Sequence, residues 1–362
     1  MSDLSTKRLI AQYEEDAGAP SFMSTFFSTG PGDIHNADTV EIDVRRAGRP
    51  IAIVVTDHKS GGNLNTMDLY TNKSFRPPLL DEEFVLNSGN LGSREMGRTP
   101  FDSPDFMGYA QRALRGGVGK MVDKIRRTVE LQSAQILQTG VVSLTDAAGN
   151  VRYTIDFQMK VEQKFGASVD WDVSPSDPLK DLATGDSLVR KNGKARVTDL
   201  VMGTNAFHNF ISNASVQAAF KTTSGMQLGG IDPSPPGSED QVYQGTVVIN
   251  GAVQKLYTYD ASYDNPNGGA DTAYIGANAV IGIARNAPRR LTYGGIPRIV
   301  PIDSRLASLG VGSLLSMNKG LALTTNAWVD PKGTTITASV ATRPLAIPVA
   351  IDGHFCINTK VS

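Results

Sequence analysis

The sequence contains very little cysteine and histidine. Cys356 is its single cysteine, so no disulfide can form within the chain and no disulfide framework supports its fold. The four histidines, His35, His58, His208 and His354, are far apart in the sequence, which excludes a local His-x-x-x-His zinc motif. A chain that needs no disulfide is expected to fold in the cytoplasm.

The chain also lacks an excess of charge of either sign. It has 35 Lys and Arg against 36 Asp and Glu, for a formal net charge of −1. This balance argues against a protein whose main task is to coat nucleic acid or anionic lipid, although it leaves room for small basic patches.

Long hydrophobic runs are absent as well. The longest, such as residues 51–55, fall far short of the roughly 20 residues of a membrane-spanning helix. The first 20 residues lack the apolar core of a signal peptide. Apolar residues still make up 40% of the 362 residues, which is enough for a sizeable core in two to three domains.

Motifs that bind nucleotides are not found. The glycine-rich stretch Gly116-Gly117-Val118-Gly119-Lys120 partly resembles a phosphate loop. Leu114 and Met121 do not fit the phosphate-loop pattern. A dinucleotide fingerprint fails because Val122 stands where its last glycine belongs. The Gly-x-Ser-x-Gly pattern of serine hydrolases does not occur either.

The isolated polar residues have simple structural interpretations. We expect His208 to be a packed or surface imidazole and Cys356 to be a small buried hydrophobic residue. Asp264 and Asp271 lack the spacing of a calcium loop, and Arg289-Arg290 is too small a basic patch to indicate nucleic acid. The sequence therefore predicts no catalytic, cofactor-binding or metal-binding residues.

Glycine and proline, in contrast, are plentiful, with 36 and 19 residues. Many lie in residues 57–100, a polar stretch with short extended pieces at 75–80 and 83–86. A segment of this length with so little core potential is uncommon inside a compact domain. We expect it to be ordered only by contact with another chain.

The clearest helix signal covers residues 104–138. Apolar residues recur at spacings of three and four from Leu114 onward, and charged residues, Glu130 among them, occupy the other face. Gly116, Gly117 and Gly119 predict a break or kink near the start, and Gly140 ends the helix.

The remaining pattern is mixed. A short helix is expected after Ser5 or Thr6, and further helices at 178–192 and 204–220. Hairpins are expected at 141–158 and at 246–259, the second around Asn250-Gly251. Further strands are expected at 39–44, 50–56, 197–202, 279–284, 321–328, 334–340 and 346–351.

This order of elements resembles the lambda-like major capsid protein E family of tailed phages, which has the HK-97-type capsid fold. The resemblance spans almost the whole chain, and each motif is weak by itself. It is carried by Phe26-Phe27 with Asp38-Thr39-Val40, the stretch VDKIRRTVELQSAQILQTG, Trp171 with Asp177-Pro178 and Asp181-Leu182, Thr292-Tyr293-Gly294-Gly295, Arg343-Pro344-Leu345, and AIDGHFCIN near the end. The glycine-rich helix start and the proline-rich residues 232–237 do not match the family.

The resemblance implies an α+β fold made of five segments. These are an N-terminal arm at 1–38 that reaches across a neighbouring subunit, an extended β-loop at 39–98, a peripheral domain with a long spine helix at 99–171, an axial domain at 172–289, and a return to the peripheral sheet at 290–362.

The resemblance also implies a function, namely a major capsid protein that self-assembles from pentamers and hexamers into the icosahedral head of a phage or prophage. Its partners would be other copies of itself, portal, scaffold or maturation protease, a decoration protein and packaged double-stranded DNA that is bound without sequence specificity. It would be found in the virion after assembly in the host cytoplasm, with no cofactor and no membrane. Two alternatives remain open: an encapsulin-like nanocompartment shell, and a cytoplasmic enzyme with a dispersed site in 172–289.

Overall fold

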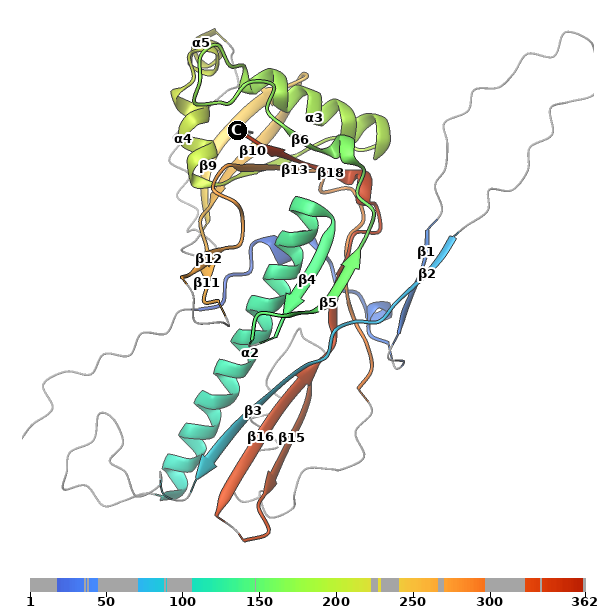
Figure 1. The fold of residues 1–362 in the computed structure, drawn as a ribbon, viewed down its shortest axis with the longest axis vertical. Coiled ribbons are helices and arrows are strands. Elements are labelled where there is room, and N and C mark those ends of the chain that lie inside the picture. Colours follow the sequence, from blue (N-terminus) through green and yellow to red (C-terminus); the bar gives the residue numbers. More distant parts are fainter. Residues whose placement is uncertain are drawn as a thin grey trace, which may run out of the picture.

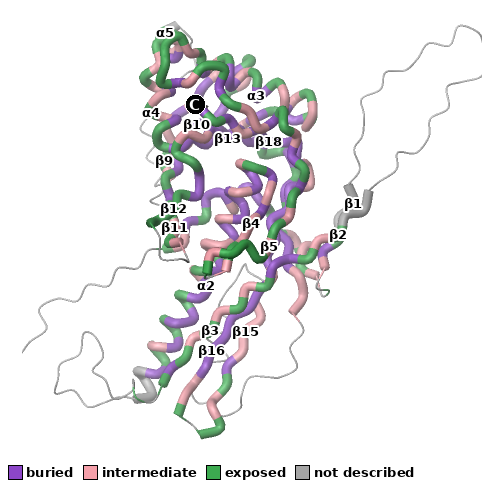
Figure 2. Tube along the Cα trace, in the orientation of Figure 1, coloured by how far each residue is buried: buried purple, intermediate pink, exposed green. Residues whose placement is uncertain are grey.

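The computed structural model describes residues 18–35, 37, 39–44, 71–87, 89, 106–146, 148–222, 227–228, 241–265, 270–296, 323–332 and 334–360. Figure 1 shows an elongated molecule in which the helix α2 (Phe106–Thr139) connects a large sheet at one end to a smaller sheet at the other. Buried residues follow the large sheet, α2 and the strand β16 (Figure 2).

The large sheet has seven strands in the order β6-β18-β13-β7-β10-β9-β8. The pairs β10–β7 and β18–β6 are parallel, and the other neighbours are antiparallel. The strand bounds are β6 Lys164–Gly166, β7 Asp199–Met202, β8 Gln227–Leu228, β9 Gln241–Ile249, β10 Ala252–Tyr259, β13 Ala279–Ile283 and β18 His354–Asn358. The sheet thus draws its strands from three of the five expected segments.

Both faces of this sheet are covered. Leu200 and Met202 of β7 point into a core shared with α3 (Pro178–Asn192), α4 (Thr204–Ser212) and α5 (Ala214–Thr222). Val201 points to the opposite face and packs in a core with Ile136 and Leu137 of α2. Because successive side chains of a strand alternate between faces, a continuous apolar run such as Leu200–Met202 serves both layers.

The smaller sheet packs on the N-terminal half of α2. Its strand order is β15-β16-β3, all antiparallel, with bounds β15 Thr324–Val329, β16 Thr335–Thr342 and β3 Leu80–Asn87. Leu86 of β3 and Val340 of β16 join a core with Leu114, Val118 and Ile125 of the helix. This core is separate from the two around the large sheet.

Four two-stranded sheets complete the strand arrangement of the described residues. They are β1 (Val40–Val44) with β2 (Thr71–Phe75), β4 (Val141–Thr145) with β5 (Val151–Asp156), β11 (Ser262–Tyr263) with β12 (Thr272–Ala273), and β14 (Arg290–Tyr293) with β17 (Pro344–Ile347). Short 3-10 helices are η1 (Met23–Phe26), η2 (Pro31–Asp33), η4 (Val161–Gln163) and η6 (Ile351–Gly353).

Several local predictions are confirmed. The expected helix at 104–138 is α2, and α3 begins with an Asp177 side chain that accepts a hydrogen bond from the backbone of Lys180. The turn between β9 and β10 is formed by Asn250 and Gly251, which have φ values of 50° and 73°. These values belong to the primed turn that Asn-Gly prefers.

Two helix predictions are wrong in detail. Helix α2 runs through its glycine cluster without the expected break, because the ring of Phe84 fills the space above Gly117, where a Cβ would lie 2.5 Å from it. The single helix expected at 204–220 is two helices. They are separated by Asn213, whose backbone is extended and whose side-chain oxygen accepts from the Ser215 nitrogen at 3.0 Å.

The expectation for residues 57–100 needs correction. Residues 80–87 form β3 within the single chain, because the alternation of Leu80, Phe84 and Leu86 supplies an apolar face that packs on α2. The other part of this stretch, apart from 71–79 and residue 89, lies outside the described residues. So do the helix expected after Ser5 and the strand expected at 50–56.

Candidate functional site

The N-terminal segment, defined here as residues 22–35, lies against the body of its own chain. Ser28 and Ile34 form parallel bridges to Arg290 and Tyr293 of β14. The backbone nitrogen of Leu291 donates to the Ser28 oxygen at 2.9 Å, and that of His35 donates to the Tyr293 oxygen at 2.8 Å. This corrects the expectation that the whole arm reaches across a neighbour, because residues 22–35 complete the edge of β14 in the same subunit.

A buried carboxylate fixes the start of this segment to α2. Glu130 is fully buried and accepts hydrogen bonds from the backbone nitrogens of Met23 at 2.6 Å and Ser24 at 2.9 Å. The hydroxyl of Tyr259 on β10 donates to the same carboxylate at 2.8 Å. Burial raises the pKa of Glu130, although the three donors favour its charged form. One side chain thus joins the N-terminal segment, the long helix and the large sheet.

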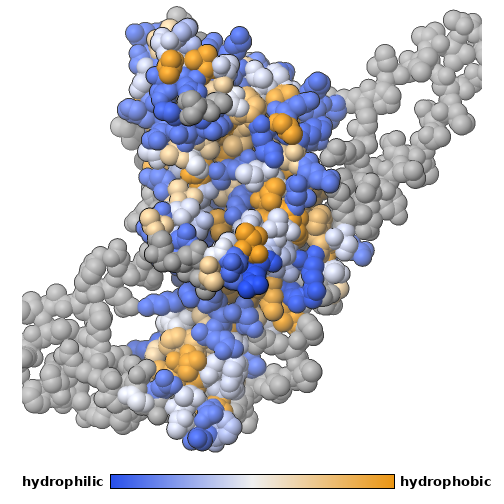
Figure 3. Space-filling model, viewed as in Figure 1, coloured by the Kyte–Doolittle hydropathy of each residue, from blue (hydrophilic) through white to orange (hydrophobic). Residues whose placement is uncertain are grey.

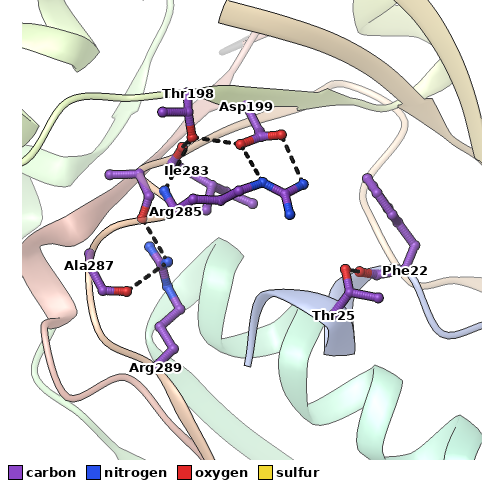
Figure 4. A network of polar contacts seen from close by, with 9 residues as sticks. Phe22, Thr25, Thr198, Asp199, Ile283, Arg285, Ala287 and Arg289 are labelled. Carbon is purple, nitrogen blue, oxygen red and sulfur yellow. Dashed lines mark hydrogen bonds and ion pairs between the residues drawn. The ribbon is translucent and has the colours of Figure 1, made fainter. Parts of the chain in front are cut away.

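A second junction, shown in Figure 4, involves Arg285 and Asp199. The guanidinium donates to both carboxylate oxygens at 3.0 Å, and the Thr198 hydroxyl donates to the same carboxylate at 2.6 Å. Asp199 is 1% exposed, so Arg285 neutralises a charge that is out of reach of water. The guanidinium carbon also lies 5.0 Å from the ring centroid of Phe26, a cation–π contact to the N-terminal segment.

A third junction joins the loop after β13 to the chain before β18. The buried guanidinium of Arg289 donates to the carbonyls of Ala284 at 2.9 Å and Gly353 at 2.9 Å. Burial lowers the pKa of Arg289 to about 10, so the side chain remains a cation at neutral pH. It therefore holds two crossing segments together.

Buried His354, like Arg289, has a structural role. Its Nε2 lies 3.2 Å from the carbonyl oxygen of Ile136 in α2. Burial, with a smaller effect of Arg289, lowers the pKa of His354 to about 3, so the ring is neutral at physiological pH. Its neighbour Gln163 donates to the carbonyls of Asp352 at 2.8 Å and His354 at 3.1 Å.

The residues that the sequence singled out do not converge. His208 is exposed on α4, Cys356 is partly buried in β18, and Arg290 pairs with Asp33 at 3.4 Å, away from buried Arg289. In the described part of the chain, no three His, Cys, Asp or Glu side chains gather in a way that could hold a metal ion. Among the same residues, no helix has the length and hydropathy to cross a membrane.

Glu130 is the residue that sequence reasoning placed incorrectly. The helical repeat assigns it to the polar face of α2, because it is not one of the apolar positions such as Val129. It is buried because the N-terminal segment covers that face near Met23 and Ser24. No pattern within α2 could reveal this, since the covering residues lie more than 100 positions earlier.

Two apolar side chains are exposed side by side on the smaller sheet. On the sheet face that points away from α2, Val85, Thr337 and Trp328 stand side by side across the three strands. Val85 is 47% exposed and Trp328 is 37% exposed, so they form an apolar spot on an otherwise polar face. Over α3 and α4 the surface in view is largely hydrophilic, with scattered hydrophobic residues (Figure 3).

Comparison with solved structures shows the fold. The chain is similar to a structure described as the capsid protein of a prophage of E. coli CFT073, with a TM-score of 0.60, 13% identity, and coverage of 94% of this chain and 93% of that chain. Gordonia phage Cozz matches with a TM-score of 0.49 and 10% identity over 98% and 91% of the two chains. The SrpI encapsulin of Synechococcus elongatus PCC 7942 matches with a TM-score of 0.48 and 9% identity over 98% and 92%.

Comparison with curated protein sequences finds no match. The family comparison is decisive, because the model of phage major capsid protein E matches residues 5–357, nearly the whole chain. The resemblance seen in the sequence and the α+β architecture of the HK-97-type capsid fold are thereby confirmed. The chain belongs to the phage major capsid protein E family.

Proposed function

We propose that this chain is the structural unit of a phage or prophage head, a closed icosahedral shell that encloses double-stranded DNA. The match to the capsid family over residues 5–357 is the observation that carries the proposal. The subunits would occupy pentamers and hexamers, and the protein would reside in the virion after assembly in the host cytoplasm. Portal, scaffold or maturation protease, and a decoration protein are its expected further partners.

The internal construction suits a unit that assembles by many modest contacts. Glu130, Asp199 and Arg289 form hydrogen bonds within the subunit, where they join segments distant in sequence. They are therefore poor candidates for acid–base chemistry, and a structural, non-enzymatic role is the function they support. In a closed symmetric shell each subunit repeats the same contacts, so avidity accumulates even when each contact is weak.

The five expected segments keep their proposed roles with two restrictions. An arm that reaches a neighbour would have to be supplied by residues before the N-terminal segment, since residues 22–35 pair with β14 of their own chain. The extended β-loop at 39–98, apart from residues 80–87 that form β3 in the same chain, is proposed to lie over an adjacent subunit. Residues 172–289 would cluster around the five-fold and six-fold axes.

Electron microscopy of the purified full-length protein tests the proposal. Closed shells of uniform diameter are the expected result, and particles isolated from a producing host should contain double-stranded DNA. Shells that enclose a cargo protein and no DNA would instead support the nanocompartment. A protein that stays monomeric under all assembly conditions would overturn the proposal.

A further inference from the structure

The dipeptide Asn-Gly occurs at three places in the sequence, residues 192–193, 250–251 and 267–268. The third pair lies outside the described residues. Asparagine is chemically labile before glycine, because a residue without a Cβ does not hinder the attack of its own backbone nitrogen on the preceding side chain. The structure places the two described pairs in different surroundings, so their reactivities should differ although the dipeptide is the same.

The reaction is intramolecular and consumes only water. The backbone nitrogen of the glycine attacks Cγ of the asparagine and gives up its proton. The new N–Cγ bond closes a succinimide ring, and Nδ2 leaves as ammonia. Water then opens the ring at either carbonyl and yields aspartate or isoaspartate, with no net oxidation or reduction. The attack requires a nitrogen that is free and a backbone that can bring it to Cγ.

The pair Asn250-Gly251 meets both requirements. It forms the exposed tip of the β9–β10 hairpin, and a Cβ added to Gly251 would meet nothing within 4 Å. The strand ladder begins with Ala252 paired to Ile249, and the nitrogen of the second residue of such a two-residue turn is not part of the ladder. An exposed turn also opens at a lower free energy than the interior of a sheet.

The pair Asn192-Gly193 meets neither requirement. The Gly193 nitrogen donates to the Val189 carbonyl at 2.7 Å, which continues the last turn of α3. The glycine also lies against the chain before β18, where a Cβ would overlap the backbone oxygen of Asp352. An attack at this pair would require α3 to unwind at its end and to separate from Asp352.

The side-chain amide of Asn250 anchors the hairpin tip to α3. Its Nδ2 donates to the Ala183 carbonyl at 3.0 Å and to the Asp186 carboxylate at 3.0 Å. Asp186 is 1% exposed, and its other oxygen accepts from the backbone nitrogen of Val197 at 3.3 Å. One buried carboxylate therefore joins α3, the hairpin tip and the chain before β7.

Deamidation would turn this anchor into a repulsion. It replaces the donor Nδ2 by a carboxylate oxygen that faces the Ala183 carbonyl and the Asp186 carboxylate, which only accept hydrogen bonds. Arg190 pairs with Asp186 at 3.2 Å and offsets part of the charge, but the donor to Ala183 is lost. Isoaspartate in addition lengthens the backbone of a turn whose geometry is matched to its strands.

We propose that Asn250-Gly251 is a deamidation site, and that its conversion releases the tip of the β9–β10 hairpin from α3. The fold protects the identical dipeptide at 192–193. The proposal concerns the folded subunit and does not depend on the proposed function.

A first experiment measures the reaction at each asparagine. Purified subunits are incubated at mildly alkaline pH, and peptide mass spectrometry follows the change from amide to carboxylate. Asn250 should convert several-fold faster than Asn192 in the folded subunit. After unfolding in guanidinium chloride, where only the dipeptide matters, the two should convert at similar rates. Equal rates in the folded subunit, or conversion of Asn250 only after unfolding, would overturn the proposal.

A second experiment measures the consequence with N250D, which is one of the two products. Hydrogen exchange at residues 246–255 should be several-fold faster in N250D than in wild type, and exchange in α2 should not change. In a D186N background the same substitution should have a smaller effect, because the like charge is absent. An effect of equal size in that background would overturn the proposal. So would exchange at the hairpin tip of N250D that equals wild type, or exchange that is faster throughout the subunit.

Discussion

The carboxylate of Glu130 lies 2.6 Å from the backbone nitrogen of Met23, a residue 107 positions earlier in the chain. The contact places the first turn of η1 on the face of α2 that the helical repeat assigns to solvent. It also brings Tyr259 of the large sheet to the same carboxylate. One buried side chain therefore contacts all three parts.

Replacing Glu130 should loosen the N-terminal segment. E130A removes the carboxylate that accepts from the Met23 nitrogen and the Tyr259 hydroxyl, which should cost about 3 kcal/mol of unfolding free energy. E130Q keeps one acceptor oxygen and should cost less. Urea unfolding measures both costs, and hydrogen exchange should show faster exchange at 22–35 in E130A. Unchanged exchange in that segment would contradict the role given to this carboxylate.

The same residue predicts a pH dependence. Burial raises the pKa of Glu130 above 4.5, so the folded chain holds this proton more tightly than the unfolded chain. Its contribution to stability is fully present below pH 4.5 and is lost as pH rises through the folded-state pKa. Wild type should therefore gain stability relative to E130Q as pH falls from about 7 toward 5. A difference in unfolding free energy that does not change with pH would contradict this.

Replacing Gly117 or Gly119 of α2 by alanine should change the unfolding free energy in opposite directions. In G117A the new Cβ would lie 2.5 Å from the Phe84 ring, so overpacking should destabilise the subunit by about 1–3 kcal/mol. In G119A the Cβ meets nothing within 4 Å, and the higher helix propensity of alanine should stabilise by up to about 1 kcal/mol. Unfolding curves of the two variants provide the comparison. A stabilising G117A would show that Phe84 does not pack on the helix as described.

The two hydrogen bonds from Arg285 to Asp199 lead us to expect that lysine is a poor substitute for arginine at position 285. R285A leaves the buried Asp199 carboxylate without its guanidinium and removes the contact to Phe26, which should cost about 2 kcal/mol. R285K keeps the charge but cannot bridge both oxygens, so it should recover only part of that loss. Adding D199N to R285A removes the uncompensated charge and should restore part of the stability. Full recovery in R285K would show that charge alone matters at this position.

The apolar spot formed by Val85 and Trp328 should act in assembly as well as in folding. Most of the Trp328 side chain is buried, so V85S/W328S should lower the unfolding free energy by about 1–3 kcal/mol and still fold. If a neighbouring copy covers the spot in the shell, the variant should assemble more slowly in light scattering. V161S, the same change at an 81% exposed valine outside this sheet, is the control. Equal assembly rates in all three proteins would place the spot outside the subunit contacts.

Local patterns predicted much of this molecule because they depend on near neighbours in the sequence. The apolar repeat of α2, the cap of α3 at Asp177 and the Asn250-Gly251 turn are all formed by residues within a few positions of one another. The ordered succession of such signals was sufficient to indicate the capsid family. The prediction that no residue set is catalytic stays a prediction.

The tertiary structure decided which local faces are covered and by what. Glu130 belongs to a polar face by its repeat and is buried by residues more than 100 positions away. Leu86 of β3 packs against residues of α2 and β16, although the surrounding sequence has little core potential. Burial by residues distant in the chain leaves no periodic pattern in the local sequence. The sequence by itself therefore determined most of the local elements and the family, while packing between distant segments determined the junctions that hold the subunit together.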